Sequence, residues 1–129
     1  MPNLVKVIKN NADALWGNGV SKKAIDDAEQ ALQLKFAEEY EEYLLAVGVA
    51  AVDGSELTGI SNSDRTDVVK VTMAKRKDFP DVPGNLYVVE DVNIDGIVIW
   101  QHENGNVFGC GFGIELHQIA DSITEYLAI

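Results

Sequence analysis

Few side chains in this 129-residue chain could carry out covalent chemistry. There are two histidines, His102 and His117, and the serines Ser55 and Ser61 stand in predicted loops with no base evident near them. Nucleophilic hydrolases need a serine or cysteine beside a base, zinc peptidases need a His-Glu-x-x-His helix, and phosphate-binding loops need a Gly-x-x-x-x-Gly-Lys pattern. None of these patterns is evident in the sequence. We therefore expect no catalytic residue and no enzymatic activity, and we interpret both histidines as surface residues and both serines as turn residues.

One segment matches the first half of a calcium-binding loop. In Asp91-x-Asn93-x-Asp95-Gly96 the oxygen-bearing side chains recur at the required alternate positions. The twelfth position, however, is His102 instead of a bidentate glutamate, and strands are predicted on both sides where a calcium loop has helices. We interpret the segment as a hairpin turn and expect no bound metal.

Three glycines, Gly109, Gly111 and Gly113, superficially match a dinucleotide-binding loop. The last spacing is wrong, and about 16 residues follow, which is too few for the strand-helix-strand unit that such a loop requires. We expect no cofactor. In an extended strand the three glycines share one face, and this bare strip permits close approach of a helix of the same domain or of a partner chain.

Acidic side chains dominate the last part of the chain. All ten lysines and arginines fall in residues 1–77, beside twelve acids, so nine of the eleven net negative charges belong to residues 78–129. A field of one sign selects a cationic partner and disfavours nucleic acid or an anionic membrane. The alternative is an acidic face that serves solubility alone. The nine acids are Asp78, Asp81, Glu90, Asp91, Asp95, Glu103, Glu115, Asp121 and Glu125.

Length and composition indicate one globular domain over residues 1–129. The longest apolar run, Leu44–Val52, is far shorter than the roughly 20 residues that span a bilayer. The first residues lead directly into an amphipathic pattern without the features of an export signal. Cys110 is the only cysteine, so an intramolecular disulfide cannot form. We expect a cytoplasmic protein that does not bind membranes.

Two helices are predicted near the start of the chain. Asn3 can cap the first, which would carry Leu15 and Trp16 near its apolar face and end at Gly17. Ser21 can cap the second, where apolar residues recur at spacings of three and four.

Two further helices are predicted, one from Ala37 to Gly48 and one from about Asp67 to Lys77. The third helix has an acidic outer face, for which the positive end of the helix dipole is a sufficient explanation. Its acids are Glu38, Glu39, Glu41 and Glu42.

After Pro83 the apolar residues recur at every second position, which indicates strands. Asp95-Gly96 and Asn104-Gly105 are strong hairpin signals between them, so we expect an antiparallel meander. Apolar residues from Ile119 to Leu127 predict a closing helix packed on the sheet. The fold class is therefore α+β, with N-terminal helices, a meander and a C-terminal helix. The predicted strands are Leu86–Val92, Ile97–Gln101 and Asn106–Ile114.

The chain contains, in this order, Ile25-x-x-Ala28-Glu29-x-x-Leu32, Leu34-x-Phe36, Glu39-Tyr40-x-x-Tyr43-Leu44, Asp53-Gly54-x-Glu56-Leu57-x-Gly59-Ile60, Pro83-x-x-Leu86-Tyr87-Val88-Val89-Glu90-Asp91, Asn104-Gly105-x-Val107-Phe108 and Ala120-x-Ser122-Ile123-x-Glu125-Tyr126-Leu127. In this order and spacing the segments resemble the SUKH superfamily of Smi1/Knr4-like domains, over about residues 20–128. Ala37 departs from the proline that the family typically has at the start of its third helix.

The resemblance implies a binding protein. Many bacterial members of the family resemble immunity proteins that neutralise a toxin domain, very often a nuclease, by direct binding. Other members are regulatory or scaffold-like interaction modules, and this is the alternative function. The first reading agrees with the acidic charge, because a nuclease presents a basic cleft that an acidic protein can occupy.

The meander is the predicted contact surface. We expect Glu90, Asp91, Asp95 and Glu103 to bind the partner, since strand edges and hairpin turns would expose them. Trp100 would be an exposed anchor beside these acids if Ile97 and Ile99 point into the core. If helices instead cover both sheet faces, Trp100 is buried.

Overall fold

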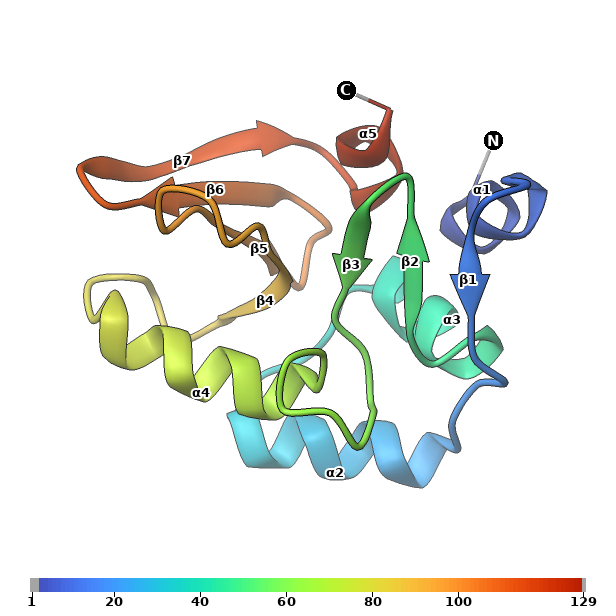
Figure 1. The fold of residues 1–129 in the computed structure, drawn as a ribbon. Coiled ribbons are helices and arrows are strands. Elements are labelled where there is room, and N and C mark those ends of the chain that lie inside the picture. Colours follow the sequence, from blue (N-terminus) through green and yellow to red (C-terminus); the bar gives the residue numbers. More distant parts are fainter. Residues whose placement is uncertain (1–2, 129) are drawn as a thin grey trace.

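A computed structural model describes residues 3–128, which form five helices and one seven-stranded sheet (Figure 1). Neighbouring strands are antiparallel and follow the sequence order from β1 to β7. The predicted α+β class is confirmed. The helices are α1 (Leu4–Asn10), α2 (Lys22–Leu32), α3 (Glu38–Ala46), α4 (Val68–Asp78) and α5 (Ile123–Leu127). The strands are β1 (Leu15–Trp16), β2 (Ala50–Val52), β3 (Ser55–Leu57), β4 (Leu86–Asp91), β5 (Val98–His102), β6 (Val107–Gly111) and β7 (Ile114–Ala120).

Three predicted helix starts are confirmed by their capping hydrogen bonds. Asn3 accepts a hydrogen bond from the backbone N–H of Lys6, and Ser21 and Asp67 cap α2 and α4 in the same way. Each cap satisfies a backbone donor that the helix itself leaves free.

The first helix is shorter than predicted. It ends at Asn10, and Leu15 and Trp16 form the edge strand β1, paired with Ala51 and Ala50. Asn11 makes the turn between them, since its side-chain oxygen accepts the backbone N–H of Asp13 at 2.9 Å. Pairing with β2 therefore decides the structure of this segment, and it overrides the apolar helical spacing.

The predicted strand Asn106–Ile114 is in fact parts of two strands, β6 and β7. Phe112 and Gly113 form the turn between them, with Gly113 at a φ of 74°. The first two residues of the predicted closing helix, Ile119 and Ala120, belong to β7, and α5 begins only after Ser122, which caps it.

The glycine strip does not receive a helix. A Cβ atom on Gly109 would lie 3.6 Å from side-chain atoms of Ile99 and Ile119, which belong to the flanking strands, and Gly113 lies in the turn. Register shifts between β6 and β7 also break the alternation that would align the three glycines.

Apolar residues fill both faces of the central strands. The larger core joins one face to α1, α2, α3 and α5, and the smaller core lies between the other face and α4 with the segment after it. Trp100 is completely buried in the smaller core, where its indole N–H points to the Cys110 sulfur at 3.3 Å. The prediction of an exposed anchor at Trp100 is therefore wrong, and the alternative of helices on both faces is correct. The smaller core consists of Val71, Leu86, Val88, Val98, Trp100 and Cys110, with Phe79, Val82, Phe108 and Leu116 packed against it.

Glu39 joins the last helix to the rest of the fold. Its carboxylate accepts the backbone N–H groups of Ile123 and Thr124 at 2.7 and 3.0 Å, and the Thr124 hydroxyl at 2.8 Å. It also accepts the Gln101 amide at 2.9 Å, and the same amide donates to the Gly105 carbonyl in the β5–β6 turn. The helix dipole was therefore an incomplete explanation of this glutamate, which connects α3, β5 and α5.

Candidate protein-binding site

The structure does not bring the five predicted contact residues together. Glu90 is 6% exposed and accepts the Tyr126 hydroxyl at 2.6 Å. A register shift between Val88 and Glu90 places Glu90 opposite Ile99, and so on the face of the larger core. Burial raises the pKa of the Glu90 carboxyl, although the hydrogen bond from Tyr126 opposes this shift. Glu90 and Trp100 are therefore interior residues and cannot form a contact surface without rearrangement.

Asp91 is half-buried and has a basic neighbour that its sequence position did not suggest. Lys75 of α4 places its ammonium nitrogen 3.3 Å from the Asp91 carboxylate and 3.7 Å from that of Asp78. Asp91 also accepts the backbone N–H of Asn93 at 3.1 Å, as expected in a hairpin turn. Much of its charge is therefore balanced within the fold.

Asp95 and Glu103 are both exposed, but they belong to different ends of the sheet. Asp95 lies in the β4–β5 turn, whereas Glu103 lies in the β5–β6 turn, and the strand β5 separates them. Glu103 lines a polar hollow. Asp95 does not line a second hollow, but its carbonyl lies 3.4 Å from the backbone nitrogen of Phe112, whose ring stacks on Phe79 in the wall of that second hollow.

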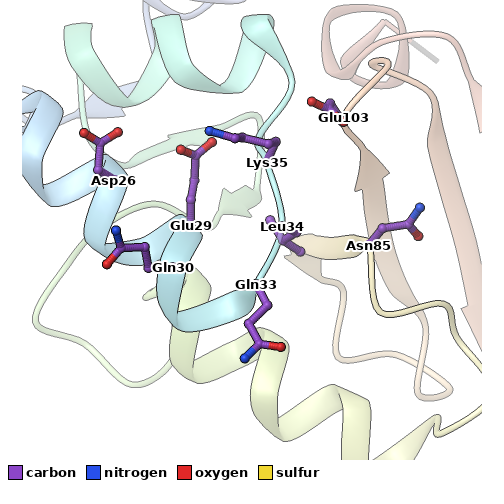
Figure 2. A pocket seen from close by; sticks show the side chains of 8 residues that line it. All are labelled: Asp26, Glu29, Gln30, Gln33, Leu34, Lys35, Asn85 and Glu103. Atoms are coloured by element: carbon purple, nitrogen blue, oxygen red, sulfur yellow. The ribbon is translucent and has the colours of Figure 1, made fainter.

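The hollow beside Glu103 is polar and has a volume of about 650 Å³. Figure 2 shows Asp26, Glu29 and Gln30 on α2, with Glu103 and Asn85 on the other side. Glu29 is buried, and its carboxylate accepts the Phe36 backbone N–H at 2.8 Å, which fixes the connection from α2 to α3. The lining residues are Asp26, Glu29, Gln30, Gln33, Leu34, Lys35, Asn85 and Glu103, and we name them the polar hollow.

The second hollow has a volume of about 380 Å³, and we name it the apolar hollow because most of its lining side chains are apolar. It lies between the segment after α4 and strands β6 and β7. Three acids, Asp78, Asp81 and Glu115, line it together with apolar side chains. Its lining residues are Asp78, Phe79, Pro80, Asp81, Val82, Cys110, Ile114, Glu115 and Leu116.

Phe112 stands in the β6–β7 turn and is 72% exposed. Its ring stacks on Phe79 at a centroid distance of 5.8 Å, and Phe79 lines the apolar hollow. Gly96 leaves room for the ring, because a Cβ atom there would lie 2.4 Å from a ring carbon of Phe112. The backbone N–H of Phe112 also points to the Asp95 carbonyl at 3.4 Å. Two hairpin turns therefore present one aromatic ring to solvent.

We name this region the hairpin-end site. It consists of Phe79, Phe112, Ile114, Asp78, Asp81, Asp95 and Glu115. Among residues 3–128, the carboxylates of Asp81, Asp95 and Glu115 have no basic side chain within 4 Å. An apolar centre with an acidic rim suits a lysine or arginine, since the aliphatic stem can pack on the rings while the charged end meets a carboxylate.

Sequence reasoning missed Phe112 because the residue was placed inside a continuous strand. The signal that could have located it is Gly111-Phe112-Gly113, since a glycine on each side of an aromatic residue also fits a turn. That turn exposes the ring, whereas a strand position would have packed it.

Of the two histidines, His102 lies apart from this site, and His117 contacts it only through the backbone of Glu115. His102 Nε2 lies 3.0 Å from the Asn85 amide, and His117 Nδ1 lies 2.9 Å from the backbone oxygen of Glu115. Within residues 3–128 no three His, Cys, Asp or Glu side chains are placed to hold a metal ion together. None of the helices described is long and apolar enough to cross a membrane.

Comparison with known proteins agrees with the fold. A SUKH family model described as "SMI1-KNR4 cell-wall" matches residues 1–127. No curated protein matches the sequence. The chain is similar to a solved structure described as "Crystal structure of protein from Pseudomonas syringae pv. tomato", with a TM-score of 0.69 and 16% identity over 88% of this chain and 83% of that chain. That likeness shows the fold alone, whereas the family model spans nearly the whole sequence, and the chain therefore belongs to the SMI1-KNR4 (SUKH) family.

Proposed function

We propose that this protein is an immunity protein that acts in the cytoplasm by binding a cognate toxin domain, and that the toxin is a nuclease with a basic active-site cleft. Family membership supports a role in protein binding. One observation supports the hairpin-end site as the surface that contacts the toxin: the Phe112 ring is exposed, and unpaired acids lie around it.

Tight binding needs charge that speeds association and an apolar anchor that slows dissociation, and the hairpin-end site offers both. Opposite charge speeds encounter, toward about 10⁸ M⁻¹s⁻¹ at low salt, but it contributes less to the lifetime of a complex. A Kd near 1 nM corresponds to about −12 kcal/mol, which requires a desolvated anchor at the centre of the contact. Phe112 and Phe79 supply this anchor, and Asp81, Asp95 and Glu115 supply the charge.

A cationic side chain of the toxin is the natural occupant of the hollow. A nuclease uses lysine and arginine to hold phosphates, and the same side chains can enter an apolar hollow with carboxylates at its mouth. Asp81 and Glu115, which line the hollow without a basic neighbour within residues 3–128, would then take the place of the phosphates. The immunity protein would block the cleft without imitating the shape of a nucleic acid.

The proposal expects a toxin domain to be encoded beside the gene of this protein, and the test uses that domain. Association and dissociation rates are measured for the wild type and for a variant carrying Asp81→Lys and Glu115→Lys. A matched variant carries Asp26→Lys and Glu103→Lys in the polar hollow, so both variants change the net charge equally. We expect association at least about 10-fold slower for the first variant than for the second, because local charges control steering.

Cell survival gives the second readout. Co-expressed wild-type protein should protect cells from the toxin domain, and the variant at the hairpin-end site should protect them less than the matched variant. Equal effects of the two variants would contradict the assignment of the site. A wild-type protein that neither binds nor protects would contradict the immunity function and favour the regulatory or scaffold alternative.

A further inference from the structure

Two asparagines of this chain are each followed by glycine, in the pairs Asn18-Gly19 and Asn104-Gly105. An asparagine in this position deamidates more readily than others, because glycine has no side chain to shield its backbone nitrogen from the asparagine side chain. The two pairs contain the same reacting atoms. A difference in their reactivity must therefore come from the surroundings that the fold gives to each pair.

The pair Asn104-Gly105 is held by hydrogen bonds in the β5–β6 turn. The Gly105 N–H donates to the His102 carbonyl at 2.8 Å. The Asn104 side-chain oxygen accepts the backbone N–H of Asn106 at 3.0 Å, and the Asn104 N–H donates to His102 Nδ1 at 3.1 Å. Deamidation joins the glycine nitrogen to the asparagine side chain, and here both groups already have partners.

The pair Asn18-Gly19 lies in the connection between β1 and α2 (Figure 1). Asn18 is exposed. Within residues 3–128, neither its side chain nor the Gly19 N–H has a hydrogen-bond partner. Both reacting groups are therefore free. Asn18 lines neither the polar hollow nor the apolar hollow, so an inference about it does not depend on the toxin contact.

We propose that Asn18 is a site of spontaneous deamidation in the folded protein. The Gly19 backbone nitrogen attacks the side-chain carbon Cγ of Asn18 and gives up its proton. The new N–Cγ bond closes a five-membered imide, while the Cγ–Nδ2 bond breaks and ammonia leaves with that proton. Water then opens the ring: cleavage of the N–Cγ bond gives aspartate, and cleavage of the original peptide bond gives isoaspartate. Water is the only co-reactant, and both products carry a new negative charge.

The two products differ in their effect on the fold. Isoaspartate lengthens the main chain by one CH₂ group, whereas aspartate only adds charge to an exposed side chain. The main chain after Asn18 is fixed, since the Val20 N–H donates to the Leu44 carbonyl at 3.0 Å. Gly19 also has little room to shift, because a Cβ atom there would lie 2.2 Å from the Leu45 carbonyl oxygen. We therefore expect isoaspartate to strain this connection and aspartate to be tolerated.

Peptide mapping by mass spectrometry tests the proposal, because deamidation replaces NH₂ by OH and raises the mass of the peptide. Folded protein is incubated at mildly alkaline pH, and the mass increase is followed at Asn18 and Asn104 in the same samples. We expect Asn18 to react at least about 10-fold faster, since Asn104 and Gly105 must first release hydrogen bonds of ordinary strength. In urea the two rates should converge, because the unfolded chain loses these surroundings. Equal rates in the folded protein, a faster reaction at Asn104, or a ratio that unfolding leaves unchanged would overturn the proposal.

Urea denaturation of the incubated protein separates the longer main chain from the added charge. Asn18→Asp carries the charge in an ordinary main chain, and its unfolding equilibrium constant should stay within about 2-fold of the wild type. For the isoaspartate fraction of incubated wild type, the constant should rise at least about 10-fold. Asn18→Gln is the matched control, because its longer side chain must close a less favourable six-membered ring. An equal loss of stability in incubated Asn18→Gln, or in fresh Asn18→Asp, would overturn the assignment of the strain to isoaspartate at this position.

Discussion

The two hollows lie at opposite ends of the central strands, and both are acidic, yet they suit different tasks. The polar hollow is the larger, but most of its lining residues carry amide or carboxylate groups, and Leu34 is its one large apolar side chain. The hairpin-end site is smaller and combines carboxylates with stacked aromatic rings. Since charge steers a partner and desolvated apolar surface holds it, only the second region offers both. An excess of negative charge therefore does not by itself identify a binding site.

The two ends also differ in how the fold holds them. The β5–β6 turn, which carries Glu103, is joined through the Gly105 carbonyl to Gln101 and from there to Glu39. No comparable chain of side-chain hydrogen bonds is seen at the Phe112 turn, within residues 3–128. One end is thus built into the interior, and the other is presented to solvent.

The largest effect that we expect is on folding, from Glu39→Ala. This change removes the acceptor for the N–H groups of Ile123 and Thr124 and for the Gln101 amide. Hydrogen bonds to a charged group contribute about 1.5 to 3 kcal/mol each, and the contributions overlap, so we expect the free energy of unfolding to fall by about 3 kcal/mol. Urea denaturation measures this change.

Glu38→Ala is the matched control for Glu39→Ala. Glu38 lies in the same first turn of α3 but is exposed, so its loss should cost less than about 0.5 kcal/mol. If both variants lose the same stability, the helix dipole explains the two glutamates equally. The proposed difference between the β5–β6 turn, which Glu39 connects to the interior, and the Phe112 turn, which faces solvent, would then lose its main support.

The second effect is on binding, from Phe112→Ala. Removing an exposed ring at the centre of a contact should cost about 2 kcal/mol, which is a 30-fold loss of affinity for the toxin domain. The free energy of unfolding should change by less than about 1 kcal/mol, because the ring is mostly solvated and packs mainly on Phe79 and Gly96. Titration calorimetry and urea denaturation on the same samples separate the two quantities. Met73→Ala is the control, because Met73 is an exposed apolar residue of α4 outside the hairpin-end site, and an equal loss of affinity there would show that Phe112 is not an anchor.

Local signals in the sequence predicted much of the fold correctly. Asn3, Ser21 and Asp67 cap helices through hydrogen bonds to residues three positions later, so a short segment contains all the information. The extended conformation of Leu15 and Trp16 depends instead on pairing with Ala50 and Ala51, which are far away in the sequence. No local spacing reveals that pairing.

The candidate site was harder to predict for the same reason. Alternation along β5 separated Trp100 from Ile99 correctly, but it could not show that α4 covers the Trp100 face. Lys75 approaches Asp91 only because α4 crosses the sheet there. The acids of the meander therefore divide into interior, paired and free groups, and this division depends on tertiary packing.

The smallest effect concerns Glu90, an acid of the meander that belongs to neither hollow. Because burial raises its pKa above the ordinary value of 4.5, the folded state binds a proton more readily than the unfolded chain does. The stability that this group contributes is therefore present below pH 4.5 and is lost as the pH rises through the raised pKa. Glu90→Gln keeps an oxygen that can accept the Tyr126 hydroxyl and stays neutral at every pH. We expect it to be more stable than the wild type at pH 7, by less than about 1 kcal/mol, with the difference vanishing toward pH 4.5.

Urea denaturation at a series of pH values measures the Glu90 effect, and Tyr126→Phe provides the opposite case. That variant removes the hydrogen bond that holds the Glu90 pKa down, so its stability should fall more steeply than that of the wild type as the pH rises. Glu90→Gln should leave the affinity for the toxin domain unchanged, since the side chain is enclosed by the fold. A loss of affinity without a loss of stability would mean that Glu90 reaches the partner after all, and the separation between acids that serve the fold and acids that face the partner would have to be redrawn.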